Sequence, residues 1–257
     1  MRIAIIGMGK MGSWLARHMA EENSVAVFDL DAKKAAGIPG AKVLAKIEGL
    51  KDFKPELLVN AVSLQNTIDG FRQAMPYLPH DCVISDMASV KGGLEKFYGA
   101  CGFRFASVHP MFGPTFANME SLREENVVVI SESDHEALEF FTKFFAKLGV
   151  KVHEFSFKEH DEMMAYSLTT PFVSSLVFAS CVDKTAVPGA TFARHMKIAK
   201  GLLSEDDHLL CEILFNPESV RQIERINSRL EFLKHVIKAK DYDEARDFLD
   251  KLRKKIA

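Results

Sequence analysis

The sequence has few cysteines and no excess of positive charge. The four cysteines, Cys82, Cys101, Cys181 and Cys211, are widely separated and form no CxxC pair, so neither a disulfide framework nor a cysteine-based metal site is expected. The 33 basic and 35 acidic residues give a formal net charge of -2, without the basic excess needed to bind a phosphate backbone. The histidines show no metal-ligand spacing either. We therefore expect no metal and no nucleic-acid partner.

Long apolar runs are also absent. The most apolar stretch, LTTPFVSSLVFASCV at residues 168–182, is shorter than the roughly 20 residues that span a bilayer, and Pro171 and several hydroxyls interrupt it. The first residues lack the charged and apolar regions of a signal peptide. We expect no membrane association and a cytoplasmic location.

The patterning along the 257 residues changes near residue 157. Before this point, short β-branched runs such as RIAII and SVAVFD alternate with amphipathic segments, which is typical of a parallel sheet covered by helices. Beyond it, apolar residues recur at helical spacing without a strand pattern. The sequence predicts an α/β fold, with a Rossmann-type doubly wound sheet in residues 1–157 followed by an all-helical C-terminal domain in residues 158–257.

Local signals predict individual elements. Further strands are expected in residues 57–63, 81–86, 103–108, 126–131 and 151–157. Ser133, with Glu136 three residues later, has the pattern of a capping box that opens a helix. Asp241 and Glu244 are expected to begin the last helix.

A glycine pattern follows the first expected strand. Residues 7–12 read GMGKMG, with Gly7 for a tight turn, Gly9 for close approach of a pyrophosphate, and Gly12 for packing of the helix on the strand. Asp29, which ends the second strand about 20 residues later, has the position of a carboxylate that binds an adenosine ribose. The pattern indicates a dinucleotide site, and the alternative is a structural turn followed by solvated acids.

Further residues bear on the choice of cofactor. Asp29 and Asp31 would repel the extra phosphate of NADP, and no arginine directly follows the strand, so NAD is favoured. Met11 also lies within the glycine turn and is a further candidate to contact the cofactor. Ser63, at the end of LLVNAVS, is expected near the ribose or nicotinamide, although a simple strand-end serine explains it nearly as well.

A histidine stands between a strand and two prolines in SVHPMFGP, residues 107–114. Proline restricts the residue before it to extended conformations, so His109 is held at the strand end. An imidazole, with an ordinary pKa of about 6.5, suits the removal of a proton from a hydroxyl while the neighbouring carbon loses hydride. We predict that His109 is catalytic, and the alternative is a structural histidine.

The segment DMASVKGG, residues 86–93, is expected beside His109. Ser89 is a candidate to orient the imidazole or to donate to the substrate oxygen, and a loop serine that caps the next helix is the ordinary alternative. Lys91 is interpreted as a solvated charge or a neighbour of phosphate. The other histidines are interpreted as residues of surface helices and strands.

With these motifs the sequence resembles the prephenate dehydrogenase family, in particular its archaeal members. The resemblance covers essentially the whole chain and rests on GMGKMG, DMASVKGG, HPMFGP and HMKIAKGLLSEDDHLLCEIL. It implies NAD-dependent oxidative decarboxylation of prephenate to 4-hydroxyphenylpyruvate in tyrosine biosynthesis. It also implies that His109 is the hydrogen-bond partner of the substrate hydroxyl, with Ser89 holding that geometry, and that the helical domain forms a homodimer.

The chain departs from the family in two places. Many bacterial relatives have histidines around the proline of the first long helix, whereas YSLTTPF places Thr169 there, so a hydroxyl is expected to bind substrate. The carboxylate-binding arginine of the family aligns best with Lys197, and Arg194 lies three residues earlier on the same helix face. Either cation is a candidate, and both have an ordinary explanation as solvated helix charges.

The sequence is also compatible with other functions. The nearest is the same reaction on arogenate. A second is another two-domain NAD(P) oxidoreductase, such as a β-hydroxyacid dehydrogenase or an imine reductase, although those lack the HPM element. From a different class of protein, the fold could serve as a nucleotide-sensing module without turnover.

Overall fold

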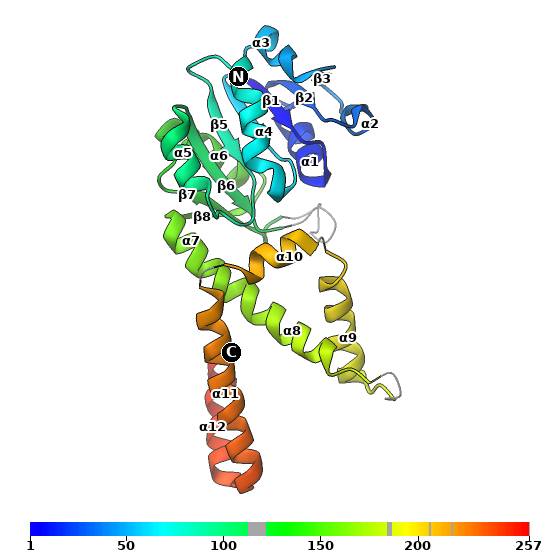
Figure 1. Ribbon diagram of the computed structural model, residues 1–257, viewed down its shortest axis with the longest axis vertical. Helices are drawn as coiled ribbons and strands as arrows, with labels where there is room; N and C mark the ends of the chain where they lie inside the picture. The colour runs from blue at the N-terminus through cyan, green and yellow to red at the C-terminus, as the bar shows by residue number, and fades with distance from the viewer. Residues whose placement is uncertain (113–121, 184–186, 206, 217, 257) are drawn as a thin grey trace. The chain divides into compact units, whose positions relative to one another are not determined.

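The computed structural model describes residues 1–112, 122–183, 187–205, 207–216 and 218–256 (Figure 1). The chain divides into two compact units, Met1–Glu162 and Met163–Ala257. The change from a strand pattern to a helical pattern in the sequence predicted a boundary slightly earlier, at residue 157.

The described part of the first unit contains an eight-stranded sheet with the order β3-β2-β1-β4-β5-β6-β7-β8. The strands are β1 (Arg2–Ile6), β2 (Ser24–Phe28), β3 (Ala41–Val43), β4 (Leu57–Asn60), β5 (Val83–Asp86), β6 (Arg104–Pro110), β7 (Asn126–Ile130) and β8 (Lys151–Phe155). Seven of these strands overlap the expected segments. The short edge strand β3 was not expected, because three residues are too few to show an alternating pattern.

Strand direction differs in part from the expected parallel sheet. Strands β1 to β6 are parallel, but β7 pairs antiparallel with β6, with His109 opposite Val128, and β8 is parallel to β7. Alternation of apolar residues is the same in both directions, so the sequence pattern does not encode the reversal. An antiparallel neighbour also needs no helical crossover, and none is found among the described residues between β6 and β7.

Helices cover both faces of the sheet (Figure 1). The helices are α1 (Lys10–Met19), α2 (Ala32–Ala35), α3 (Leu50–Phe53), α4 (Thr67–Ala74), α5 (Leu94–Cys101) and α6 (His135–Lys147), with 3-10 turns at Ile47–Gly49, Leu64–Asn66 and Met75–Tyr77. Successive strand residues point to opposite faces. Ile5 therefore packs in the core beneath α1 and α6, whereas Ile6 packs in the core beneath α3, α4 and α5. This two-sided burial confirms the predicted α/β class.

The start of α6 differs from the predicted capping box. The N-cap is Asp134, whose carboxylate accepts hydrogen bonds from the backbone N–H groups of Glu136 and Ala137, each at 3.2 Å. The hydroxyl of Ser133 instead accepts from the backbone N–H of Ser107 at 3.1 Å. Since aspartate caps a helix as well as serine does, the helix begins one residue later and Ser133 is free to join the loop to β6.

The described residues of the second unit are helical, as predicted. After α7 (Phe157–Met164), which spans the division, a π-helix (Ala165–Thr169) leads into α8 (Thr170–Ser180), α9 (Ala190–Leu202), α10 (Asp207–Leu214), α11 (Ser219–Ala239) and α12 (Tyr242–Ile256). Pro171 lacks a backbone N–H and so cannot donate the usual helical hydrogen bond. The wider π turn before it accommodates this missing hydrogen bond. Asp241 caps α12 through the N–H groups of Asp243 and Glu244, as expected. None of the helices in the described ranges is both long and apolar enough to cross a membrane.

Candidate functional site

The glycine turn between β1 and α1 is fixed by close packing. Gly7 has a φ of +87°, and a Cβ there would lie 2.5 Å from the backbone nitrogen of Val62. A Cβ on Gly12 would lie 1.9 Å from the carbonyl oxygen of Gly7. In contrast, a Cβ on Gly9 would meet nothing within 4 Å. Gly7 and Gly12 are therefore required by the fold, whereas Gly9 leaves open space at the helix start.

Asp29 ties the second strand to this turn. The backbone N–H of Met8 donates to Asp29 Oδ2 at 2.6 Å, and the N–H of Asp31 donates to Asp29 Oδ1 at 2.8 Å. A carboxylate has about four lone-pair sites, so two remain for a ligand. The role of Asp29 in holding the turn is not visible in the spacing of the sequence, because it depends on a contact across 21 residues.

A cleft of about 720 Å³ opens beside the turn. It lies at the carboxyl ends of β1, β2 and β4, where the strand order reverses and α/β folds commonly bind ligands. Its lining comes from the glycine turn, from the acids after β2 and from polar residues after β4, and includes Gly7, Gly9, Met11, Asp29, Asp31 and Ser63. Five of the six residues predicted to bind the cofactor therefore meet in one cleft, and the sixth, Gly12, packs beneath it.

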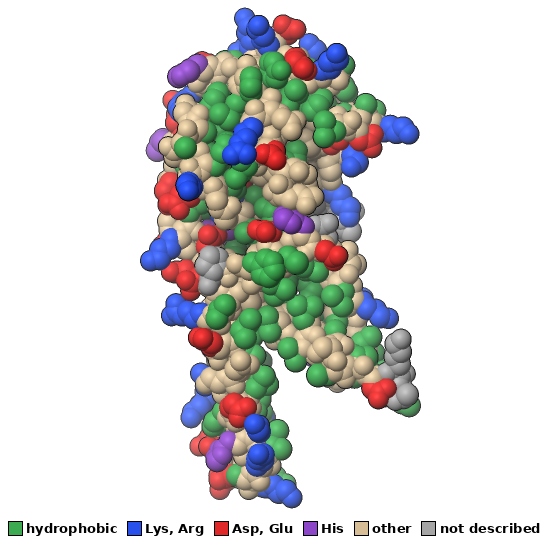
Figure 2. Space-filling view, in the orientation of Figure 1, with side chains coloured by type: hydrophobic (Ala, Val, Ile, Leu, Met, Phe, Trp, Pro, Cys, Tyr) green, Lys and Arg blue, Asp and Glu red, His purple; other side chains and the backbone are tan. Residues whose placement is uncertain are grey.

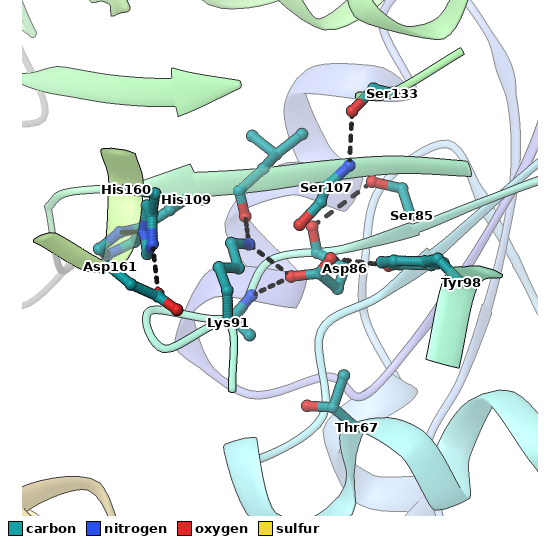
Figure 3. A network of polar contacts seen from close by, with 12 residues as sticks. Thr67, Ser85, Asp86, Lys91, Tyr98, Ser107, His109, Ser133, His160 and Asp161 are labelled. Carbon is teal, nitrogen blue, oxygen red and sulfur yellow. Dashed lines mark hydrogen bonds and ion pairs between the residues drawn. The ribbon is translucent and has the colours of Figure 1, made fainter. Parts of the chain in front are cut away.

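A buried polar network lies at the ends of β5 and β6 (Figure 3). Lys91 Nζ donates to Asp86 Oδ1 at 2.6 Å and to the carbonyl oxygen of Val108 at 2.9 Å. The Tyr98 hydroxyl donates to Asp86 Oδ2 at 2.7 Å, and the N–H of Ala88 donates to Oδ1 at 2.9 Å. Lys91 is only 1% exposed, so its interpretation as a solvated charge was wrong. The physical reason is that β5 buries the carboxylate of Asp86, and a buried carboxylate needs a cation beside it.

Burial sets the ionisation of this network. Burial lowers the pKa of Lys91, while the carboxylate of Asp86 acts in the opposite direction. Burial and the neighbouring Asp86 raise the pKa of Tyr98, which therefore remains a hydroxyl and a donor. Because Lys91 bonds both Asp86 and the end of β6, the network fixes the loop that carries Ser89 against the strand that carries His109.

His109 is the penultimate residue of β6 and is 6% exposed. Its Nδ1 lies 3.0 Å from Nε2 of His160, a fully buried residue in the first turn of α7 (Figure 3). His160 Nδ1 lies 3.1 Å from Asp161 Oδ1. Within the described part of the chain, the ring partner of His109 is His160 rather than Ser89, which was the expected orienting residue. The interpretation of the other histidines as surface residues was wrong for His160.

Both histidines are held in the neutral form. Burial lowers the pKa of His109 well below its ordinary value, and His160 and Lys91 add to the effect. Burial also lowers the pKa of His160. A neutral imidazole has one acceptor nitrogen, so this arrangement provides a base or hydrogen-bond acceptor at pH 7.

The remaining candidates lie in the helical unit. Thr169 is fully buried, and its hydroxyl bonds to the hydroxyl of Ser219 at 2.7 Å. Lys197 and Arg194 are exposed on α9. In the HPMFGP motif, Gly113 and Pro114 lie outside the described residues. The substrate-binding roles of Thr169, Lys197 and Arg194 therefore stay predictions.

Fold and cleft together define a Rossmann-type nucleotide-binding domain followed by a helical unit. The family model described as "Prephenate dehydrogenase, nucleotide-binding domain" matches residues 22–154, slightly more than half of the 257 residues. The chain therefore belongs to the prephenate dehydrogenase family, which confirms the resemblance seen in its motifs.

Individual relatives are similar at moderate identity. The T-protein of Enterobacter agglomerans is 26% identical over 154 residues, which are 56% of this chain and 40% of the relative. Arogenate dehydrogenase 1, chloroplastic, of Arabidopsis thaliana is 23% identical over 248 residues, which are 91% of this chain and 39% of the relative. The chain thus spans about 40% of the length of these curated relatives.

A solved structure shows the same fold. The prephenate dehydrogenase from A. aeolicus in complex with hydroxyphenyl propionate and NAD+ has a TM-score of 0.84 to this chain at 21% identity. The likeness covers 99% of this chain and 96% of that one. It confirms the order of a mostly parallel α/β sheet followed by helices.

Proposed function

We propose that the chain is an NAD-dependent dehydrogenase that oxidises and decarboxylates prephenate to 4-hydroxyphenylpyruvate in tyrosine biosynthesis. One observation carries the proposal: the glycine-turn cleft and His109 lie at the same edge of the sheet, because β1 and β4 to β6 are parallel and all end there. Membership of the prephenate dehydrogenase family supports the substrate class. Arogenate, which carries an amino acid side chain instead of a pyruvyl group, is the alternative substrate.

The cleft fits a dinucleotide. Gly9 opens the helix start without a capping side chain, so backbone N–H groups of α1 are available to phosphate oxygens. Asp29 retains lone pairs for ribose hydroxyls, and its charge together with that of Asp31 disfavours an added phosphate. When bound, NAD supplies the acceptor for a hydride.

His109 is proposed to act on the substrate hydroxyl. As the carbon that bears the hydroxyl loses its hydrogen with both electrons, the oxygen becomes more acidic. A neutral imidazole accepts its hydrogen bond and stabilises the growing positive charge of the ring. Loss of the ring carboxylate as carbon dioxide then leaves its electron pair in the ring, and the hydroxyl becomes the phenol of the product. Ser89 is proposed to donate to the same oxygen.

A direct assay tests the function. The protein is mixed with NAD and either prephenate or arogenate, and the absorbance of the reduced cofactor is followed. Faster turnover of prephenate is expected. Faster turnover of arogenate would favour the alternative substrate, whereas binding of NAD without turnover of either compound would contradict the enzyme and favour a nucleotide-sensing module.

Asp29→Ala is expected to weaken NAD binding and to reduce the preference for NAD over NADP. The substitution removes the acceptor of the Met8 N–H and, by the proposal, the acceptor of the ribose hydroxyls. Dissociation constants for NAD and NADP, measured by isothermal titration calorimetry, separate the two roles. Loss of the turn alone would weaken both cofactors equally, whereas loss of the ribose contact changes their ratio.

Asp31→Ala is the matched control for this experiment. Asp31 lines the same cleft with the same charge, but its carboxylate accepts from the N–H of Lys33 rather than from the glycine turn. A smaller effect on NAD is therefore expected. If Asp29→Ala and Asp31→Ala change both affinities alike, the ribose assignment is wrong.

The helical unit is proposed to bind substrate and to form a homodimer in the cytoplasm. Figure 2 shows hydrophobic side chains at the surface of this unit, and those exposed on α11 and α12 include Val220, Leu230, Ile237, Leu249 and Ile256. Apolar surface of this kind commonly marks an interface. Light scattering that gives the mass of one chain, 28.8 kDa, at working concentration would contradict the dimer.

A further inference from the structure

We propose that His160 is a positioning residue that, together with Asp161, holds His109 in the tautomer with its proton on Nδ1. This arrangement leaves Nε2 of His109 as the acceptor. The catalytic consequence rests on the proposed function, whereas the tautomer itself does not.

The proton positions follow from the two contacts. An ionised carboxylate only accepts hydrogen bonds, so the contact at 3.1 Å from Asp161 Oδ1 to His160 Nδ1 requires the proton on that nitrogen. Neutral His160 then has its lone pair on Nε2. The contact at 3.0 Å from His160 Nε2 to His109 Nδ1 therefore requires the donor to be His109. In neutral His109, Nε2 is left with the lone pair.

Burial makes this chain of contacts effective. Both rings are buried, and they meet edge-on with centroids 5.2 Å apart. Water therefore has little access to replace either partner, and a hydrogen bond left unmade at this depth costs the full desolvation of the unpaired group. The alternative tautomer of His109 would place two lone pairs against each other across the 3.0 Å contact, so it is disfavoured.

The charged neighbours keep both rings neutral. The groups that act on the pair are Lys91, Asp86 and Asp161. Lys91 disfavours a second proton on either ring, and burial acts in the same direction. Asp161 favours the protonated form of His160 but is less buried, with 32% of its side chain exposed. Both rings are therefore neutral, and the tautomer assignment applies to this neutral pair of histidines.

The start of α7 fixes where His160 stands. The hydroxyl and N–H of Ser156 both donate to Glu159 Oε2 at 2.8 Å, and the Glu159 N–H donates to Ser156 Oγ at 3.2 Å, which forms a capping box. Phe157, three residues before His160 and thus on the same helix face, packs against the rings of Tyr98 and Phe105. The imidazole of His160 is therefore presented by a rigid helix start.

Nuclear magnetic resonance on the full chain tests the tautomer without any substrate. Ring ¹⁵N shifts distinguish a protonated nitrogen from one with a lone pair, and the His109 signals are assigned by their loss in His109→Asn. In the wild type, Nδ1 of His109 is expected to carry the proton. In His160→Leu the acceptor is lost, and the proton is expected to move to Nε2 in part of the molecules or all of them.

Two further variants sharpen the comparison. His160→Gln offers a carbonyl oxygen near the position of the lost nitrogen and is expected to retain the proton on His109 Nδ1. His153→Leu removes a histidine whose Nε2 contacts Asn126 on the neighbouring strand, and no change at His109 is expected. A wild-type proton on Nε2, or an unchanged tautomer in His160→Leu, would overturn the proposal. If His160→Leu does not fold, the wild type and His160→Gln still decide the question.

Kinetics measure the consequence for catalysis. His160→Leu is expected to lower the turnover number by about 10- to 100-fold, while the KM for NAD stays unchanged. A loss of this size is typical when the hydrogen-bond partner of a metal-bound histidine is removed. Rescue by His160→Gln would separate positioning from loss of packing. If the wild type shows the expected tautomer but no turnover, the proposed function fails and the positioning role stands. If the wild type turns over with the proton on Nε2, only the positioning role fails.

Discussion

His109→Asn is expected to lower the turnover number by about 100- to 10,000-fold with little change in affinity for NAD, which is the range typical of general acid-base groups. The substitution suits this fold because the asparagine amide can still donate to His160 from near the position of the lost Nδ1. The Nε2 acceptor, in contrast, has no replacement. Steady-state kinetics with the better of the two substrates, together with calorimetric titration of NAD, measure the effect.

The pH dependence of the wild type provides a second check on His109. In the proposed mechanism the acting form is the neutral ring. Burial holds the pKa of His109 well below 6.5, so protonation removes the acceptor only as the pH falls toward that lowered pKa. We expect no loss of turnover from this group between about pH 8 and about pH 6.5. A midpoint near 6.5 that disappears in His109→Asn would show a solvated imidazole, and an unchanged turnover number in the variant would remove His109 from the mechanism.

Lys91→Met is expected to destabilise the first unit by about 3–5 kcal/mol, because removal of one partner leaves a buried charge without its counterion. The variant retains the apolar length of the side chain, and among the described residues it leaves the Asp86 carboxylate with the donors from Tyr98 and Ala88. It also removes the donor to the Val108 carbonyl. Urea unfolding followed by fluorescence reports on this unit, since the single tryptophan, Trp14, is buried in its core.

Lys143→Met is the matched control. Lys143 Nζ lies 2.7 Å from Glu139 Oε1, but the two side chains are 73% and 54% exposed. Surface pairs of this kind contribute about 0–1 kcal/mol. Equal unfolding midpoints for the two variants would contradict the structural role of Lys91. Tyr98→Phe, which removes one donor to Asp86, is expected to fall between them.

Local patterns predicted much of the nucleotide half of the chain. Short β-branched runs located seven strands, because this pattern involves only neighbouring residues. The spacing from Gly7 to Asp29 located the cleft, because the strand–helix–strand unit between them has a regular length. His109 was located by the proline directly after it, Pro110, which is the last residue of β6. The antiparallel direction of β7 carried no local signal.

The buried partners of the site were harder to predict. His160 meets His109 across 51 residues, and Lys91 meets a carboxylate that the sequence alone does not show to be buried. One signal for His160 was present: it lies three residues after the apolar Phe157 and four before Met164, on one face of a helix. A histidine on an apolar helix face needs a buried hydrogen-bond partner, and another histidine at a strand end was a candidate.

The hydrogen bond between Met8 and Asp29 constrains how the cofactor cleft could be redesigned to take NADP. Removing the acid to admit a phosphate would also leave the Met8 N–H of the glycine turn without this acceptor. A workable exchange must keep an oxygen acceptor at position 29, as asparagine or serine would, and introduce the new cation at a separate position on the rim of the cleft.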